Sequence, residues 1–346
     1  MNFCCLYDKD FKALGKWTSH LCSSFKLVKR AYDYDELEVE CQGFENSKDA
    51  SYIILHDKYG NPLYCAFCGI PTTKNNLTKI KAIDCREIFN QDIYLDFSIQ
   101  DSDGTYKYKT LGDLYTYLLK DCLTDYNIGV IYKIDTLEAS ILEWDEEKIS
   151  RTKAIRNVYE MIQAVNNLYN CIVVPEVGVE SATGTYYLKF TVKRIVNTIP
   201  IKLSDYGAET SQNSNIINRI VCVSGSQKQV LYLQKDNTIS STYVEDNALL
   251  PPRIETIEKD TLEEAISDGY SKLADSMYKD RVKINLNTKN GERLKNVDLT
   301  YFADISEYNP ADTNSVKRLP VYAISIDSNE NKTIEFGRLS TYWFLD

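Results

Sequence analysis

The sequence predicts a β-rich α+β protein in which strands come first, an α+β segment follows, and further strands with one helix complete the chain. Three observations support this prediction. Residues 1–100 contain closely spaced strand patterns, two amphipathic helical patterns lie near the middle, and several apolar strand segments fill the last third. We find no short-period repeat and no low-complexity tract in this order.

The first part of the chain reads as a succession of strands. Leu37, Val39 and Cys41 alternate with glutamates, which indicates a strand with one buried and one acidic face. Residues 57–62 are rich in turn formers and predict a hairpin between their neighbouring strands. The other predicted strands are Phe25–Ala31, Ser51–His56, Leu63–Gly69, Thr78–Ile83 and Tyr94–Phe97. Such spacing is typical of a small antiparallel barrel or sandwich.

Residues 101–195 change in character and predict a separate α+β domain. After a loop at 101–104, Thr110 is placed as the N-cap of a helix with Asp113 near its positive end. One helical face would carry Leu111, Leu114, Tyr115, Leu118 and Cys122. A second helix is predicted over 151–169, with the apolar stripe Ile155, Val158, Ile162, Val165 and Tyr169. Two strands are predicted after it, at Cys171–Val174 and Tyr186–Val192.

The last part, residues 196–346, returns to strands. The clearest are Ile220–Val223, Val230–Gln234, Val282–Leu286, Val321–Ile326 and Thr333–Phe336. One amphipathic helix, 261–278, interrupts them, and Thr261 with Glu264 forms a capping-box pattern at its start. Its apolar face of Leu262, Ile266, Tyr270, Leu273 and Met277 is typical of core packing.

Charge and composition exclude several classes of function. Lys and Arg number 40 against 50 Asp and Glu, for a net charge of −10, so we expect no specific nucleic-acid binding and no basic membrane-binding surface. No apolar run reaches the length of a membrane span, and the charged N-terminal residues predict no export signal. The 26 Tyr residues favour half-buried strand faces and wet interfaces.

The ten cysteines are expected to be reduced thiols, many of them small core residues. Cys65 and Cys68 have the spacing of a metal-binding pair, but three positions along one strand place them on opposite faces. No second pair of this kind follows, so a zinc site would have to recruit distant thiols. We therefore predict no metal site and no cofactor.

Candidates for catalysis are few. His56 and Asp57 are neighbours at a predicted hairpin turn, without a visible nucleophile, and His20 is interpreted as structural. Glu143, Asp145, Glu146 and Glu147 could be imagined as a glycosidase-like carboxylate pair. An acidic run just before a helix is more often a solvated helix start, so the sequence predicts no catalytic residue and no enzyme.

The order of segments in the last third resembles that of tail hub proteins. The matching segments are Asn218–Val223, Val230–Leu233, Lys235–Asn237, Thr261–Met277, Asp280–Leu286, Val321–Ile326 and Thr333–Arg338. Asp84-Cys85-Arg86 and the residues up to Phe97 add to the likeness in the first part. The family is that of bacteriophage tail and baseplate hub proteins, which includes the N-terminal module of tail-associated lysins, contractile injection system hubs and the hub part of type VI secretion spikes.

The resemblance implies two antiparallel β-barrel domains, 1–100 and 196–346, with residues 101–195 as an inserted peripheral α+β domain. Three chains would form a homotrimeric ring that adapts a sixfold tail tube to a threefold spike or fibre. Partners would be the tail tube or distal tail protein ring, and a central spike, fibre or tape measure protein. The chain would be made in the bacterial host cytoplasm and reside in the virion tail, at the baseplate or tail tip. Since the sequence ends soon after Phe336, we expect no lytic domain.

Two further readings remain open from the sequence. The protein could be a receptor- or carbohydrate-binding tail-tip protein, with an aromatic cleft in residues 101–195. It could instead be a hydrolase, which would require Glu143 or Asp145 for activity. In the hub reading, the excess of acidic residues would line a channel for DNA ejection, where repulsion discourages DNA from sticking.

Overall fold

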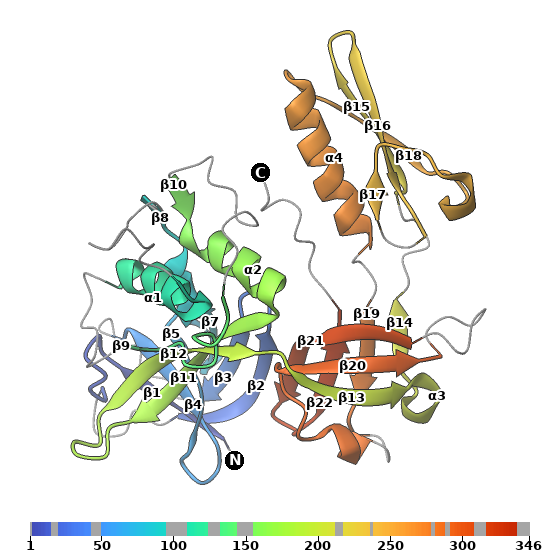
Figure 1. Ribbon diagram of the computed structural model, residues 1–346. Helices are drawn as coiled ribbons and strands as arrows, with labels where there is room; N and C mark the ends of the chain where they lie inside the picture. The colour runs from blue at the N-terminus through green and yellow to red at the C-terminus, as the bar shows by residue number, and fades with distance from the viewer. Residues whose placement is uncertain are drawn as a thin grey trace.

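The computed structural model describes residues 2–14, 20–42, 50–94, 109–123, 132–143, 155–211, 217–235, 238–277, 281–287, 291–307 and 316–337. Strands dominate this part of the chain and pair into several sheets, with helices packed on two of them (Figure 1). The prediction of a β-rich fold with fewer helices is thus confirmed. None of the described helices is long and apolar enough to span a lipid bilayer.

Six strands of the first part make up what we call the N-terminal strand set. They are β1 (Phe3–Tyr7), β2 (His20–Arg30), β3 (Glu36–Gln42), β4 (Tyr52–His56), β5 (Pro62–Phe67) and β7 (Leu77–Asp84), and the short β6 (Thr72–Lys74) pairs beside β7. Pairing runs in the order β1-β4-β5-β7-β3-β2, and β1 also pairs with β2 through Phe3 and Cys4. The predicted hairpin and the burial of Leu37, Val39 and Cys41 are confirmed.

A second group of six strands, the C-terminal strand set, follows in the last part. Its members are β13 (Asn197–Lys202), β14 (Glu209–Ser211), β19 (Arg281–Asn285), β20 (Tyr301–Ser306), β21 (Val316–Asp327) and β22 (Lys332–Phe336). Pairing runs β13-β20-β21-β22-β19-β14. The short helices α3 (Leu203–Tyr206) and η4 (Gly291–Leu294) lie in its connections. One core, which includes Val282, Ile284 and Phe336, fills the inner side of this set.

The two strand sets are joined edge to edge. Strand β2 pairs antiparallel with β21 from Lys26 opposite Asp327 to Arg30 opposite Ala323. Backbone pairing therefore continues from the first part of the chain into the last, as the neighbouring blue and red strands of Figure 1 show. The division into two barrel domains stays a prediction.

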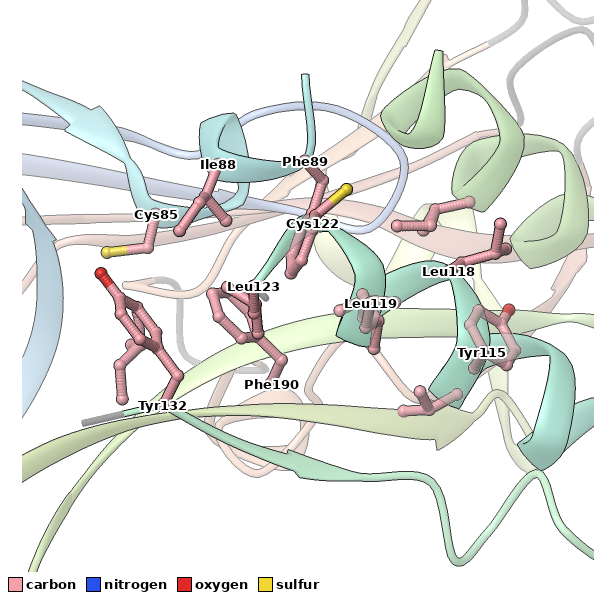
Figure 2. Packing of buried hydrophobic residues seen from close by; sticks show 14 of the residues in the cluster. Cys85, Ile88, Phe89, Tyr115, Leu118, Leu119, Cys122, Leu123, Tyr132 and Phe190 are labelled. Atoms are coloured by element: carbon pink, nitrogen blue, oxygen red, sulfur yellow. The ribbon is translucent and has the colours of Figure 1, made fainter. Parts of the chain in front are cut away.

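Residues 85–94 and the middle of the chain form a helical layer with small strands on one side of the N-terminal strand set. Its elements are η1 (Cys85–Phe89), β8 (Asp92–Tyr94), α1 (Leu111–Cys122), β9 (Tyr132–Asp135), β10 (Ile155–Asn157), α2 (Val158–Tyr169), β11 (Cys171–Val179) and β12 (Tyr186–Arg194). Figure 2 shows side chains of η1, α1 and β12 meeting in its core. There the rings of Phe89 and Phe190 pack edge to face, with their centroids 4.7 Å apart. This core also takes in Cys5 and Ile54 of the strands, so it is shared between residues 1–100 and 101–195.

The helix predictions for this layer hold with one correction. Thr110 and Asp113 cap α1 reciprocally, because the Thr110 hydroxyl accepts from the Asp113 amide and the Asp113 carboxylate accepts from the Thr110 amide. The second helix begins at Val158, with the Asn157 side chain accepting from the backbone N–H of Glu160. Ile155 does not join the helical stripe, because it pairs with Tyr94 in the strand pair β10–β8. The loop predicted at 101–104 and residues 151–154 lie outside the described residues.

The remaining strands form a separate four-stranded sheet in the order β17-β16-β15-β18. Its elements are β15 (Arg219–Ser224), β16 (Gln227–Leu233), β17 (Ile239–Ser240), β18 (Ile254–Glu258) and helix α4 (Leu262–Met277), with the single turn η3 (Glu245–Asn247) between β17 and β18. Helix α4 packs on one face, over Ile220, Cys222 and Leu231, and stands apart from the large sheet in Figure 1. The family resemblance implied that these segments belong to a second barrel, whereas they pair here in a sheet of their own. Thr261 accepts from the Glu264 amide, as the capping pattern predicted.

Candidate functional site

The neighbours His56 and Asp57 both make contacts that stabilise the β4–β5 turn. Nδ1 of His56 lies 3.1 Å from the carbonyl oxygen of Gly60, and its buried ring stacks on Phe3 with centroids 5.0 Å apart. Burial lowers the pKa of His56. The Asp57 carboxylate accepts from the amide and the side chain of Asn61, which closes the turn. Both residues therefore have a structural role in the hairpin, and neither needs a catalytic role to account for its contacts.

The other catalytic candidates are only partly described. Glu143 makes a backbone bridge to Thr110 ahead of helix α1. Asp145, Glu146 and Glu147 lie outside the described residues, so the predicted absence of a carboxylate pair stays a prediction. His20 begins strand β2 opposite Cys4 of β1.

Cys65 and Cys68 point to opposite sides of the sheet, as their spacing predicted. Cys65 is buried in the core shared with the helical layer, whereas Cys68 packs against the core on the other face of the strands. The two thiols therefore do not face a common ion.

Three thiols from distant positions in the sequence lie together, although no sequence pattern predicted that they would be neighbours. Cys4 of β1, Cys22 of β2 and Cys41 of β3 are buried, and their sulfur atoms all lie within 4.8 Å of one another. The Sγ atoms of Cys4 and Cys22 are 3.1 Å apart, and Cys22 stands directly opposite Cys41 in the β2–β3 register. We call this group the cysteine trio. No local pattern in the sequence predicted this group, because the thiols are brought together by the pairing of β2 with β1 and with β3.

A buried ionic cluster ties the start of η1 to the β2–β3 turn. Arg86 Nη2 lies 2.6 Å from Asp84 Oδ2 and 2.8 Å from Asp35 Oδ1, and the same nitrogen donates to the Asp33 carbonyl at 2.7 Å. All three charged side chains are almost fully buried. Burial raises the pKa of Asp35 to about 6, although the Arg86 charge opposes this shift. This arrangement, which includes the Asp84-Cys85-Arg86 segment of the family resemblance, is a structural clamp.

An open cleft lies where the N-terminal strand set, the helical layer and the C-terminal strand set meet. Its volume is about 450 Å³. The apolar walls are Pro62, Leu63, Ile172, Val174, Pro175, Val177, Leu299 and Ile324. Lys29, Tyr64, Glu176, Lys193 and Asp298 add polar groups.

The polar groups of the cleft differ in whether they have hydrogen-bond or ion-pair partners. Glu176 binds Lys193 and accepts from the Thr191 hydroxyl, so its pKa is lowered although burial opposes the shift. The Lys29 ammonium lies 5.6 Å from the ring centre of Tyr64, and burial lowers its pKa. The Tyr64 hydroxyl has no hydrogen-bond partner among the described residues. Apolar walls with a few polar groups suit packing against a ligand or partner segment.

Comparison with known proteins identifies the fold. No family model and no curated protein matches the sequence. Among solved structures, the chain is similar to the 43 kDa tail protein of prophage MuSo2 from Shewanella oneidensis, with a TM-score of 0.52 and 9% identity over 99% of this chain and 98% of that one. It is similar to a chain of the phage P2 baseplate in its activated conformation, with a TM-score of 0.56 and 10% identity over 97% and 98%.

These similarities extend over nearly the whole length of both chains. The protein therefore has the fold of phage tail and baseplate proteins, which confirms at the level of fold the resemblance drawn from the order of its segments.

Proposed function

We propose that this protein is a structural component of a phage tail, the baseplate hub, and that it acts without catalysis. The observation that supports this best is full-length similarity to a prophage tail protein and to a chain of a phage baseplate. A match confined to one sheet would indicate only a shared motif, whereas this one includes both strand sets, the helical layer and the separate sheet.

The hub is proposed to be a homotrimeric ring. Each chain carries two six-stranded sets that lie side by side through β2 and β21. Three chains would supply six such sets, which is the number needed to face a sixfold tail tube while the ring itself remains threefold. In this proposal each set is a barrel, and residues 101–195 form the peripheral inserted domain.

The proposed partners follow from that position. One face of the ring would contact the tail tube or the distal tail protein ring, and the other a central spike, fibre or tape measure protein. The protein would reside in the virion tail after synthesis in the host cytoplasm. The net charge of −10 supports an acidic DNA channel, and a map with a neutral or basic channel would contradict this part.

Light scattering of the purified chain at several concentrations tests the ring. We expect the mass of a trimer, followed by threefold particles with a central channel in electron micrographs. Mixing with the tube and spike proteins of the same phage is the companion test, and we expect co-migration with both. A chain that is monomeric alone and in the mixtures would overturn the hub proposal.

A receptor- or carbohydrate-binding role is the competing outcome. It predicts saturable binding of cell-wall glycans by the isolated chain, and the same assay distinguishes the two functions. Hub function predicts no saturable glycan binding.

A further inference from the structure

The three sulfur atoms of the cysteine trio lie close enough together to bind a single metal ion. Its members come from three adjacent strands, β1, β2 and β3, and their side chains converge on one point inside the core of the N-terminal strand set. Cys4 and Cys41 are fully buried, and Cys22 is 5% exposed. A chance cluster of small core residues would not require the three sulfur atoms to face one another.

We propose that Cys4, Cys22 and Cys41 bind one thiophilic d10 cation through three thiolates. Metal–sulfur bonds of about 2.3 Å around one ion place three sulfur atoms about 4 Å apart. The observed limit of 4.8 Å and the 3.1 Å separation of Cys4 and Cys22 bracket that spacing. Small side-chain rotations are therefore enough to form the site.

The donor set selects the class of ion. Thiolates prefer soft cations such as Cu⁺ and Zn²⁺, whereas Mg²⁺ and Ca²⁺ require oxygen ligands. Within the described part of the chain, the group contains thiols alone. The surrounding side chains are apolar, among them Leu27, Val39 and Ile80.

Cu⁺ and Zn²⁺ differ in the number of ligands they prefer and in the net charge of the complex with three thiolates. Three ligands are acceptable to Cu⁺ but leave a net charge of −2 in an apolar core, whereas Zn²⁺ leaves −1 but prefers a fourth ligand. Both ions displace the thiol protons, so three protons pass to solvent for each ion bound, and affinity falls as pH is lowered. Either ion would fasten the N-terminal strand β1 to β2 and β3.

The test is a metal titration of the reduced full-length chain without oxygen, with Cu⁺ and with Zn²⁺ in competition with chromophoric chelators. We expect one equivalent of at least one ion to bind. Cys4→Ala, Cys22→Ala and Cys41→Ala should each weaken binding by at least about 100-fold, since even outer-shell changes cost 10- to 100-fold. Cys222→Ala is the matched control, because Cys222 is equally buried but lies in the separate sheet, and it should bind like the wild type.

X-ray absorption of the metal-loaded wild-type chain provides a second measurement that does not depend on the variants folding. Three sulfur neighbours around the ion are expected for either cation. The proposal is overturned if neither ion binds stoichiometrically, if the shell lacks three sulfurs, or if folded trio variants titrate like Cys222→Ala.

Discussion

The N-terminal and C-terminal strand sets have the same number of strands but are buried differently. Every residue of β4 is buried, because Tyr52 and Ile54 face the helical layer while Ile53 and Leu55 face the opposite core. In β19 of the C-terminal set, burial alternates along the strand. Strands alike in pairing can therefore differ in whether one or both faces are covered, and this depends on what the rest of the chain places against them.

Removal of the buried arginine should produce the largest effect. Arg86→Ala leaves Asp84 and Asp35 buried without their countercharge, and we expect it to lower the free energy of unfolding by about 3–5 kcal/mol. Arg318→Ala in the C-terminal set breaks the pair of the exposed Arg318 with Asp304 and should cost far less than Arg86→Ala. Urea unfolding measures both. Equal losses would contradict the proposed difference between the sets.

Substitutions of successive residues test the covering of both faces directly. Ile53→Ala and Ile54→Ala should each cost about 2–5 kcal/mol, because the two side chains fill different cores. In β19, Ile284→Ala should cost as much, whereas Lys283→Ala should change stability by about 0.5 kcal/mol or less. A small effect of Ile54→Ala in urea unfolding would show that the helical layer does not cover β4.

The pH dependence of stability should also differ between the sets. Burial raises the pKa of Asp35 from its ordinary value of 3.8 to about 6, so its stabilising contribution is present below about pH 4 and is lost as pH rises through about 6. The shift corresponds to about 3 kcal/mol. Asp35→Asn should remove this loss, measured as the difference in unfolding free energy from the wild type at pH 4 and pH 7.

Asp304 provides the control of opposite sign. The Arg318 side chain lowers its pKa, so its contribution is present at neutral pH and is lost as pH falls through the lowered value. Asp304 is only partly buried and its partner Arg318 is exposed, so water screens the pair and Asp304→Asn should have little effect. The same slope in both variants would contradict the assignment of the Asp35 shift to burial.

The smallest expected effect concerns helix caps. Thr110→Ala removes the acceptor for the Asp113 amide and should lower stability by about 1 kcal/mol. Because α1 packs in the core shared with β4, this loss should appear in the main unfolding transition. Thr261→Ala at α4 should instead affect the transition of the separate sheet, and calorimetry of both variants tests this assignment.

Sequence patterns predicted the elements whose faces differ in polarity. The alternation in β3 and the stripe and cap of α1 were recognised correctly, because one face of each meets a core and the other meets water. Strand β1 was missed, since Cys4 to Tyr7 are all buried and show no alternation.

Tertiary context decided the remaining differences. Strand β11 continues past its predicted end at Val174, through Pro175 and Gly178, to Val179. It is an edge strand, so the missing proline N–H is tolerated, and the Tyr187 ring occupies the space beside Gly178. The cysteine trio depended on the registers of three strands, which no local pattern encodes.

The pairing of β2 with β21 has a consequence for how the chain is made. During translation, His20–Arg30 leaves the ribosome long before Val316–Asp327. The edge of β2 that pairs with β21 therefore stays unpaired while the residues between them are synthesised. Contacts so distant in sequence slow folding, and an unpaired strand edge is a site for aggregation. A nascent chain of this protein should therefore depend on chaperones until its last strands emerge.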